Sequence, residues 1–265
     1  MHLTKEQAAG FLLLKHGLRG EYKFLGKDGI LSFIKQASCI QYDPIDICGR
    51  NADLVLQSRV KGYKKSYLYE LLYEQRSLID YWDKNMSIMR TEDWPYFSRT
   101  REKFEQETYY QENILAAYDD VKNAIVEKGA CSSKDIELLG KVRWPWGETR
   151  VSRAALESLY FRGELVIHHK AGTQKYYDFA SALLPHSLLS AADPNKTRED
   201  YFAWQVSRRI GSVGLLWNRP SDAYLFIHGM NAHSRTAAFQ RLLSSGRILK
   251  IEVKGIQKPF YMLSS

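Results

Sequence analysis

Apolar residues recur at helical spacing in the first sixty residues of the chain. Thr4 can cap a short first helix, because Gln7, three residues on, can reach back to it. Asp28 can cap a second helix, whose apolar stripe lies within residues 30–34. Pro44 then forces a new start, because proline restricts the residue before it. Three helices in this length predict a helix-turn-helix core.

An internal repeat occupies the second half of the chain. Residues 154–177 align without a gap on residues 237–260, an offset of 83 throughout. Each copy predicts an amphipathic helix ended by a glycine (Gly163 or Gly246) and followed by two strands that a glycine-containing turn joins. The expected strands are Glu164–Lys170 and Lys175–Phe179, then Arg247–Lys254 and Lys258–Leu263. A helix followed by a basic hairpin is typical of the recognition helix and wing of a winged-helix unit.

Further helical segments complete each unit. They are expected at Ile114–Glu127 and Ser132–Leu139 before the first copy, and at Asp200–Gly211 and Asp222–His228 before the second. We therefore predict an α+β fold, predominantly α-helical, of three tandem winged-helix units, each a helix-turn-helix with a β-hairpin wing. The expected segments are 1–100 for the first unit, 101–183 for the second, 184–197 for a linker and 198–265 for the third.

The charge of the chain favours a polyanionic partner. Its net charge is +8 and its pI is about 9.2. Residues 198–265 contain ten basic and four acidic residues, whereas residues 101–197 contain thirteen and fourteen. We predict binding to double-stranded DNA, with contacts from the second and third helix–wing pairs through Arg153, Lys170, Lys175, Arg241, Lys254 and Lys258. The alternative is a protein-interaction module, a role that winged helices also serve.

Cysteine and histidine spacing predicts neither a disulfide framework nor a metal site. Cys39, Cys48 and Cys131 are odd in number and form no CxxC pair. His168 and His169 are adjacent on an expected strand and should point to opposite faces. The first residues lack a signal-peptide pattern, and no apolar run is long enough to span a membrane. We expect no metal, no cofactor and no membrane association.

Chemistry is most plausible in the segment around Gln41 and Asp43. Pro44 biases Asp43 towards extended backbone, so side chains two residues apart should project to the same side. A carboxylate beside an amide can hold one water molecule. The alternative is that Asp43 is a helix N-cap, with Pro44 as the first helical residue and Asp46 in the first turn. The two interpretations are compatible.

Three short segments carry a resemblance to a known family. Gln41-Tyr42-Asp43, the run Asp53–Val60 and Asp80-Tyr81-Trp82 resemble the YcaQ/AlkZ family of bacterial winged-helix DNA glycosylases, which unhook interstrand crosslinks and excise alkylated purines. The resemblance covers the whole chain and is most specific between Ile40 and Trp82. It implies three tandem winged helices, a monofunctional glycosylase acting on alkylated or crosslinked purines in duplex DNA, and Gln41 and Asp43 as the catalytic pair.

The chain departs from the family pattern in two places. After Tyr81-Trp82 the family usually has a histidine, whereas this chain has Asp83-Lys84, so the histidine's role is lost or passes to Lys84. The family also has a C-terminal β-rich domain, whereas this sequence stops at Ser265, just after the expected third wing, so it is either a truncated chain or a short branch of the family.

Further candidate DNA contacts lie near the catalytic pair. Arg50 and Arg59 are candidates for phosphate contacts, with salt bridges to nearby acids as the equally weighted alternative. Trp82 can stack on a base, although packing in the core is the favoured interpretation. We expect a monomer in the bacterial cytoplasm, associated with the nucleoid. The alternative function is a non-catalytic winged-helix DNA-binding regulator, which needs the recognition helices Val151–Phe161 and Ser234–Leu243 but not Gln41.

Overall fold

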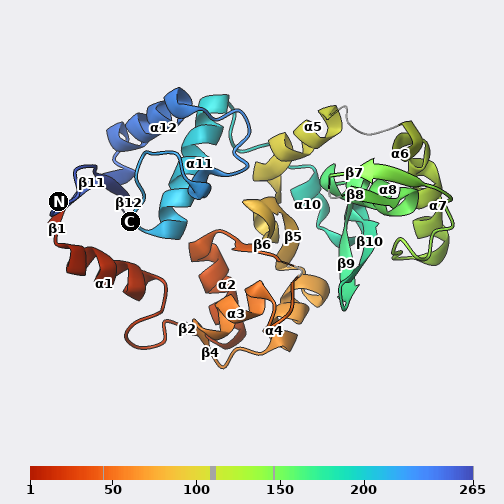
Figure 1. Cartoon of the computed structure of the whole chain (residues 1–265), viewed down its shortest axis with the longest axis horizontal. Coiled ribbons are helices and arrows are strands. Elements are labelled where there is room, and N and C mark those ends of the chain that lie inside the picture. Colours follow the sequence, from red (N-terminus) through yellow and green to blue (C-terminus); the bar gives the residue numbers. More distant parts are fainter. Residues whose placement is uncertain (44, 108–111, 146, 265) are drawn as a thin grey trace. The chain divides into compact units, whose positions relative to one another are not determined.

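The described residues form two compact units (Figure 1). A computed structural model of the chain describes residues 1–43, 45–107, 112–145 and 147–264. The first unit contains Met1–Tyr69, Asp83–Arg90 and Pro194–Ser265, and the second contains Glu70–Trp82 and Thr91–Asp193. Both units are therefore built from segments that are distant in sequence. Helix predominates over strand in a mixed α and β composition.

The first unit begins with helices joined by very short strands. Its helices here are α1 (Lys5–Lys15), α2 (Gly26–Ala37), α3 (Asn51–Gln57) and α4 (Lys65–Tyr69). Its strands are β1 (His2–Leu3), β2 (Phe24–Leu25), β3 (Ile40–Gln41), β4 (Val60–Lys61) and β6 (Asn85–Arg90). The predicted capping box is confirmed: the Gln7 N–H donates to Thr4 Oγ1 at 3.2 Å, and the Thr4 N–H donates to Gln7 Oε1 at 2.9 Å. The second helix begins at Gly26, so Asp28 lies in its first turn and is not its cap.

The C-terminal part of the first unit packs two helices against a hairpin. These elements are α11 (Arg198–Val213), the 3-10 turn η3 (Asp222–Tyr224), α12 (Ala232–Ser244), β11 (Ile248–Val253) and β12 (Phe260–Leu263). Val206, Ile210, Phe239 and Leu242 are fully or almost fully buried in their shared core. The N-terminal β1 adds to this hairpin in parallel, with His2 opposite Glu252. The first residues of the chain are thus tied to its last strands.

The second unit is organised around one buried helix, α8 (Val151–Phe161). Its other helical elements are η1 (Glu70–Glu74), η2 (Thr91–Phe97), α5 (Ser98–Gln106), α6 (Glu112–Ala116), α7 (Tyr118–Lys128), α9 (Ala180–Leu183) and α10 (His186–Leu189). Its strands are β7 (Lys141–Trp144), β8 (Gly147–Arg150), β9 (Leu165–Ala171) and β10 (Gln174–Phe179), and β5 (Leu78–Asp83) ends at the unit boundary. Helices α5, α6 and α7 and strands β7, β8 and β9 all contact α8.

The two copies of the repeat are folded as helix plus hairpin, but in different units. The first copy is α8 with β9 and β10 in the second unit, and the second is α12 with β11 and β12 in the first unit. The strand bounds agree with the expected ones to within two residues. Between α11 and α12, only Asp222–Tyr224 of the helix expected at Asp222–His228 is helical. The assignment of three winged-helix units with the segment bounds given above stays a prediction.

Candidate functional site

Gln41 and Asp43 lie where a short strand leaves its sheet. β3 pairs antiparallel with β6, and Gln41 is opposite Ser87. The Tyr42 N–H donates to the Met86 carbonyl at 2.8 Å, which extends the pairing by one residue. On the other side, Asn51 Nδ2 donates to the Gln41 carbonyl at 2.7 Å. The backbone is therefore held from both sides, while Gln41 and Asp43 are themselves exposed.

The Asp43 carboxylate closes a local turn. Its Oδ1 accepts a hydrogen bond from the Ile45 N–H at 3.0 Å, the pattern of an aspartate bonding to the backbone two residues on. The helix-cap interpretation is wrong in its detail, because residues 45–50 are not helical and α3 begins only at Asn51, after Arg50. Pro44 lies outside the described residues. The carboxylate satisfies a loop N–H and remains open to a ligand.

A buried ionic cluster lies beneath this segment, within the same unit. Asp83 pairs with Arg208 at 2.6 Å and with Arg209 at 2.5 Å, and its side chain is fully buried. Burial alone would raise the pKa of Asp83, but the two guanidinium groups outweigh it and lower that pKa. Arg208 also donates to the Ser38 carbonyl at 2.7 Å. These bonds tie α11 to the residues immediately before β3.

Cys39 lies beside this cluster, whose surroundings disfavour its thiolate form. Burial, reinforced by the nearby Asp83 carboxylate, raises the pKa of the Cys39 thiol to about 11. The raised pKa favours the protonated thiol near neutral pH and so disfavours thiolate chemistry at this position. The three residues Asp83, Arg208 and Arg209 were missed by the sequence analysis. The one available signal was the adjacent arginine pair on the apolar side of an amphipathic helix.

The arginines predicted near the site make local contacts. Arg50 Nε lies 3.3 Å from Asp46 Oδ2, so Arg50 forms the salt bridge that is the alternative to a phosphate contact. Arg59 donates to the Val55 carbonyl at 3.1 Å and to Ser58 Oγ at 2.7 Å, and its guanidinium lies over the Phe33 ring. Both are half-buried. Each stiffens the loop or helix end that carries it, and a phosphate contact stays a prediction.

Trp82 and Lys84 flank the buried Asp83 in sequence and lie in different units. Trp82 belongs to the second unit, where its ring packs 5.5 Å from the Phe104 ring and 5.4 Å from the Phe161 ring. That packing corresponds to the favoured interpretation, and we do not propose Trp82 as a stacking residue. Lys84 belongs to the first unit and is half-buried between β5 and β6. That Lys84 takes over the role of the family's histidine stays a prediction.

Basic residues predicted on the second helix and wing lie mostly inside the second unit. Of α8, Val151, Ser152 and every residue from Ala154 to Tyr160 are buried, so this helix has almost no surface to place in a DNA groove. A helix that is apolar on nearly all sides is buried as a rule. Arg153 is exposed but pairs with Glu157 at 3.1 Å. We therefore do not propose α8 as a DNA recognition helix.

The wing lysines of that unit, Lys170 and Lys175, also lie among buried groups of the same unit. Lys170 is 4% exposed and lies 2.6 Å from the Asp80 carboxylate, which is itself buried. Burial lowers the pKa of Lys175 to about 8, which the nearby Glu157 carboxylate opposes only in part. Neither lysine is free to neutralise a phosphate, and we do not propose them as DNA contacts. His168 and His169 do not point apart as expected, because their Nδ1 atoms lie 2.8 Å from each other.

The third helix and wing keep their polar face at the surface. α12 buries Arg235, Ala238, Phe239 and Leu242 and exposes the opposite face, which includes Arg241. Arg241 is half-exposed and forms an ion pair with Asp200. Lys254 and Lys258 are exposed on the loop that joins β11 to β12. Of the predicted helix–wing contacts, these three and Arg153 are exposed, and Arg241 and Arg153 each pair with an acid.

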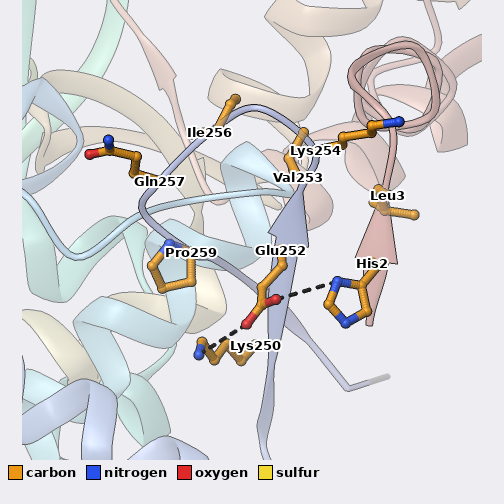
Figure 2. Close-up of a pocket in the computed structure, with 9 residues that line it drawn as sticks. All are labelled: His2, Leu3, Lys250, Glu252, Val253, Lys254, Ile256, Gln257 and Pro259. Carbon is orange, nitrogen blue, oxygen red and sulfur yellow. Dashed lines mark ion pairs between the residues drawn. The ribbon is translucent and has the colours of Figure 1, made fainter.

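A pocket of about 490 Å³ lies beside β1 and β11 (Figure 2). Figure 2 shows Glu252 between the His2 imidazole at 3.3 Å and the Lys250 ammonium group at 3.2 Å. Lys254 also lines the pocket, whereas Gln41 and Asp43 do not.

Among the described residues, no three His, Cys, Asp or Glu side chains lie together as metal ligands. No helix within the described residues is long and apolar enough to cross a membrane.

The two units differ strongly in charge. The first unit contains 24 Lys and Arg against 11 Asp and Glu, a net charge of +13. The second contains 14 against 19, a net charge of −5. Gln41, Asp43, Arg241, Lys254 and Lys258 all lie in the first unit. The electrostatic attraction for a polyanion therefore resides in the unit that carries the candidate site.

Two comparisons place the chain among known proteins. A family model described as "DNA glycosylase AlkZ-like" matches residues 34–265. Among solved structures, the chain is similar to Streptomyces sahachiroi DNA glycosylase AlkZ, with a TM-score of 0.64 and 13% sequence identity. That match covers 100% of this chain and 71% of the other. At this identity the second comparison shows a shared fold.

Proposed function

Because the chain belongs to the DNA glycosylase AlkZ-like family, we propose that it hydrolyses the N-glycosidic bond of alkylated or crosslinked purines in duplex DNA. Gln41 and Asp43 are the proposed catalytic pair. The observation that carries this proposal is the exposed Gln41–Asp43 edge, held by β6 on one side and by Asn51 on the other, in the unit of net charge +13.

The chemistry suits a carboxylate beside an amide. Alkylation at N7 makes the purine a cationic leaving group, so it departs with both electrons of the bond to C1′ and needs little acid help. Positive charge develops on the sugar, and a carboxylate stabilises it electrostatically. A water molecule adds to C1′ and gives up a proton. In the proposed mechanism Asp43 accepts that proton and Gln41 orients the water by hydrogen bonds.

The surroundings of Asp43 support this role by restricting its motion. The hydrogen bond from the Ile45 N–H fixes one carboxylate oxygen and leaves the other for water. Asn51 holds the carbonyl of Gln41, and the Asp83 cluster anchors the residues just before β3. Pre-organised groups contribute to catalysis because they need not reorder during the reaction. The proposed reaction uses no metal and no cofactor.

Duplex binding is proposed to come from the first unit. Arg241, Lys254 and Lys258 are exposed there, and their charges are not enclosed in a core. Phosphate contacts of this kind position a duplex without reading its sequence. The second unit, with net charge −5 and a buried α8, is proposed to have a structural role.

The test is release of N7-methylguanine from methylated duplex DNA. We compare the parent chain with Asp43→Asn and Gln41→Ala, and with Asp28→Asn as a matched control on an exposed aspartate outside the site. We expect release by the parent and Asp28→Asn, and loss on the order of a hundredfold or more in the two site variants. A monofunctional enzyme leaves an abasic site in an intact strand. A parent that binds duplex but releases no base would instead be a DNA-binding regulator.

A further inference from the structure

The loop that follows Asp43 exposes two isoleucines. Ile47 is 92% exposed and Ile45 is 62% exposed, within three residues of each other. Single apolar side chains at a surface are ordinary, and what distinguishes this pair is its position beside a proposed catalytic carboxylate. The loop therefore presents an apolar tip at the edge of the site.

The loop is fixed at both ends. Asn51 Nδ2 bonds to the Gln41 carbonyl at 2.7 Å, so the residues that flank the loop are tied together. Inside it, Asp46 pairs with Arg50 at 3.3 Å, which also offsets a negative charge that would repel DNA. Gly49 has a φ of 127°, and a Cβ there would lie 2.9 Å from Leu54 Cδ2. The sequence thus builds a defined loop that keeps its isoleucines outside.

The tip is also coupled to the site. The Ile45 N–H is the group that donates to Asp43 Oδ1. A displacement of the tip therefore moves the carboxylate. The loop lies in the unit of net charge +13, which favours a polyanion over a neutral or basic surface, such as a second copy of this unit, as its occupant.

We propose that residues 45–48 form an apolar wedge, with Ile47 at its tip, that inserts between base steps of duplex DNA beside the lesion. Proteins that act from the minor groove use isoleucine and similar side chains in this way, and the insertion unstacks and kinks the duplex. A crosslinked base cannot swing freely out of the helix, so local unstacking gives access to its sugar without full extrusion. This inference rests on the proposed function, because it takes duplex DNA as the ligand.

The test uses a duplex that contains 2-aminopurine next to a tetrahydrofuran abasic-site analogue, which no glycosylase can cleave. Fluorescence of 2-aminopurine rises when its stacking is lost. At saturating protein, we expect the parent to raise the fluorescence and Ile47→Ser to abolish the rise. Duplex affinity of Ile47→Ser should fall by about tenfold, in keeping with the loss of one buried isoleucine. Val126→Ser, at an apolar position 73% exposed in the second unit, is the matched control and should behave as the parent.

The outcomes separate the wedge from catalysis. A fluorescence rise that depends on Ile47 supports the wedge even if the parent releases no base, in which case only the proposed glycosylase activity fails. An unchanged rise in Ile47→Ser, or no duplex binding by the parent, overturns the wedge. If sedimentation instead shows a parent dimer that Ile47→Ser dissociates, with fluorescence unaffected, the tip covers a second copy of the chain and the proposal is wrong.

Discussion

Replacing Asp83 by asparagine should destabilise the first unit more than any single surface substitution. The side chain of Asp83 is fully buried, and those of Arg208 and Arg209 are 7% and 3% exposed. Asp83→Asn leaves two buried guanidinium groups without their counter-charge. Removal of one partner from a buried ion pair costs about 3–5 kcal/mol, because the remaining charge is uncompensated. Local opening of α11 should therefore become about a hundred- to several-thousandfold more frequent.

Native-state hydrogen exchange measures this opening directly. Backbone amides of α11 and β3 should exchange faster in Asp83→Asn by that factor, while amides of the second unit keep their rates. Glu252→Gln, which removes an exposed carboxylate paired with Lys250, is the control and should have little effect. Exchange in α11 that accelerates less than about fivefold would refute the view that this cluster anchors the site.

The pH dependence of the same variant has a defined sign. The folded-state pKa of Asp83 is lowered, so its ion pairs stabilise the native state above the unfolded pKa of about 3.9. This stability is lost as the pH falls through the lower folded value. The difference in exchange between parent and variant should therefore be constant above about pH 5 and shrink under stronger acid.

Three further predictions follow from the burial and charge of other residues. Lys254→Ala combined with Lys258→Ala should lower the slope of log affinity against log salt by about two, as measured by fluorescence anisotropy on duplex DNA, and an unchanged slope would place the contacts elsewhere. Lys175→Met should stabilise the second unit at neutral pH without weakening duplex binding, because burial lowers the pKa of Lys175 to about 8 and disfavours its charged form. The gain in stability should fade as the pH rises above about 8. A large loss of duplex affinity would instead show that Lys175 contacts DNA. Iodoacetamide should modify the exposed Cys48 well before Cys39 and Cys131, whose thiol pKa values are raised by burial, and duplex DNA should protect Cys48; equal labelling of all three by mass spectrometry would contradict this.

Sequence reasoning succeeded where the signal was local. The capping box of Thr4 and Gln7 involves residues three apart, and the two hairpins follow from alternating strands around a glycine turn. The prediction that α8 is an exposed recognition helix was wrong, because the few polar residues of α8 were taken to form a surface face. In the structure Glu157 accepts a hydrogen bond from the buried Trp144 indole at 2.8 Å, so that polar side chain belongs to the core.

The parts of the site that were missed depend on distant pairs. Asp83 and Arg208 are 125 residues apart, and β1 reaches β11 across nearly the whole chain. No periodicity or spacing links such residues in a single sequence. The extended backbone at Gln41 was predicted, but the loop after Asp43 was not, because the sequence Asp43-Pro44 equally fits a helix start and an aspartate turn.

The central claim is that Asp43 carries out hydrolysis at an exposed site in the basic unit. The most direct measurement is the single-turnover rate of N7-methylguanine release at saturating protein, for the parent and for Asp43→Asn, with duplex affinity measured in parallel. The account predicts a rate lower by about a hundredfold or more in Asp43→Asn, with an affinity that stays within about twofold of the parent. Equal rates for the two proteins would show that Asp43 is not the catalytic carboxylate.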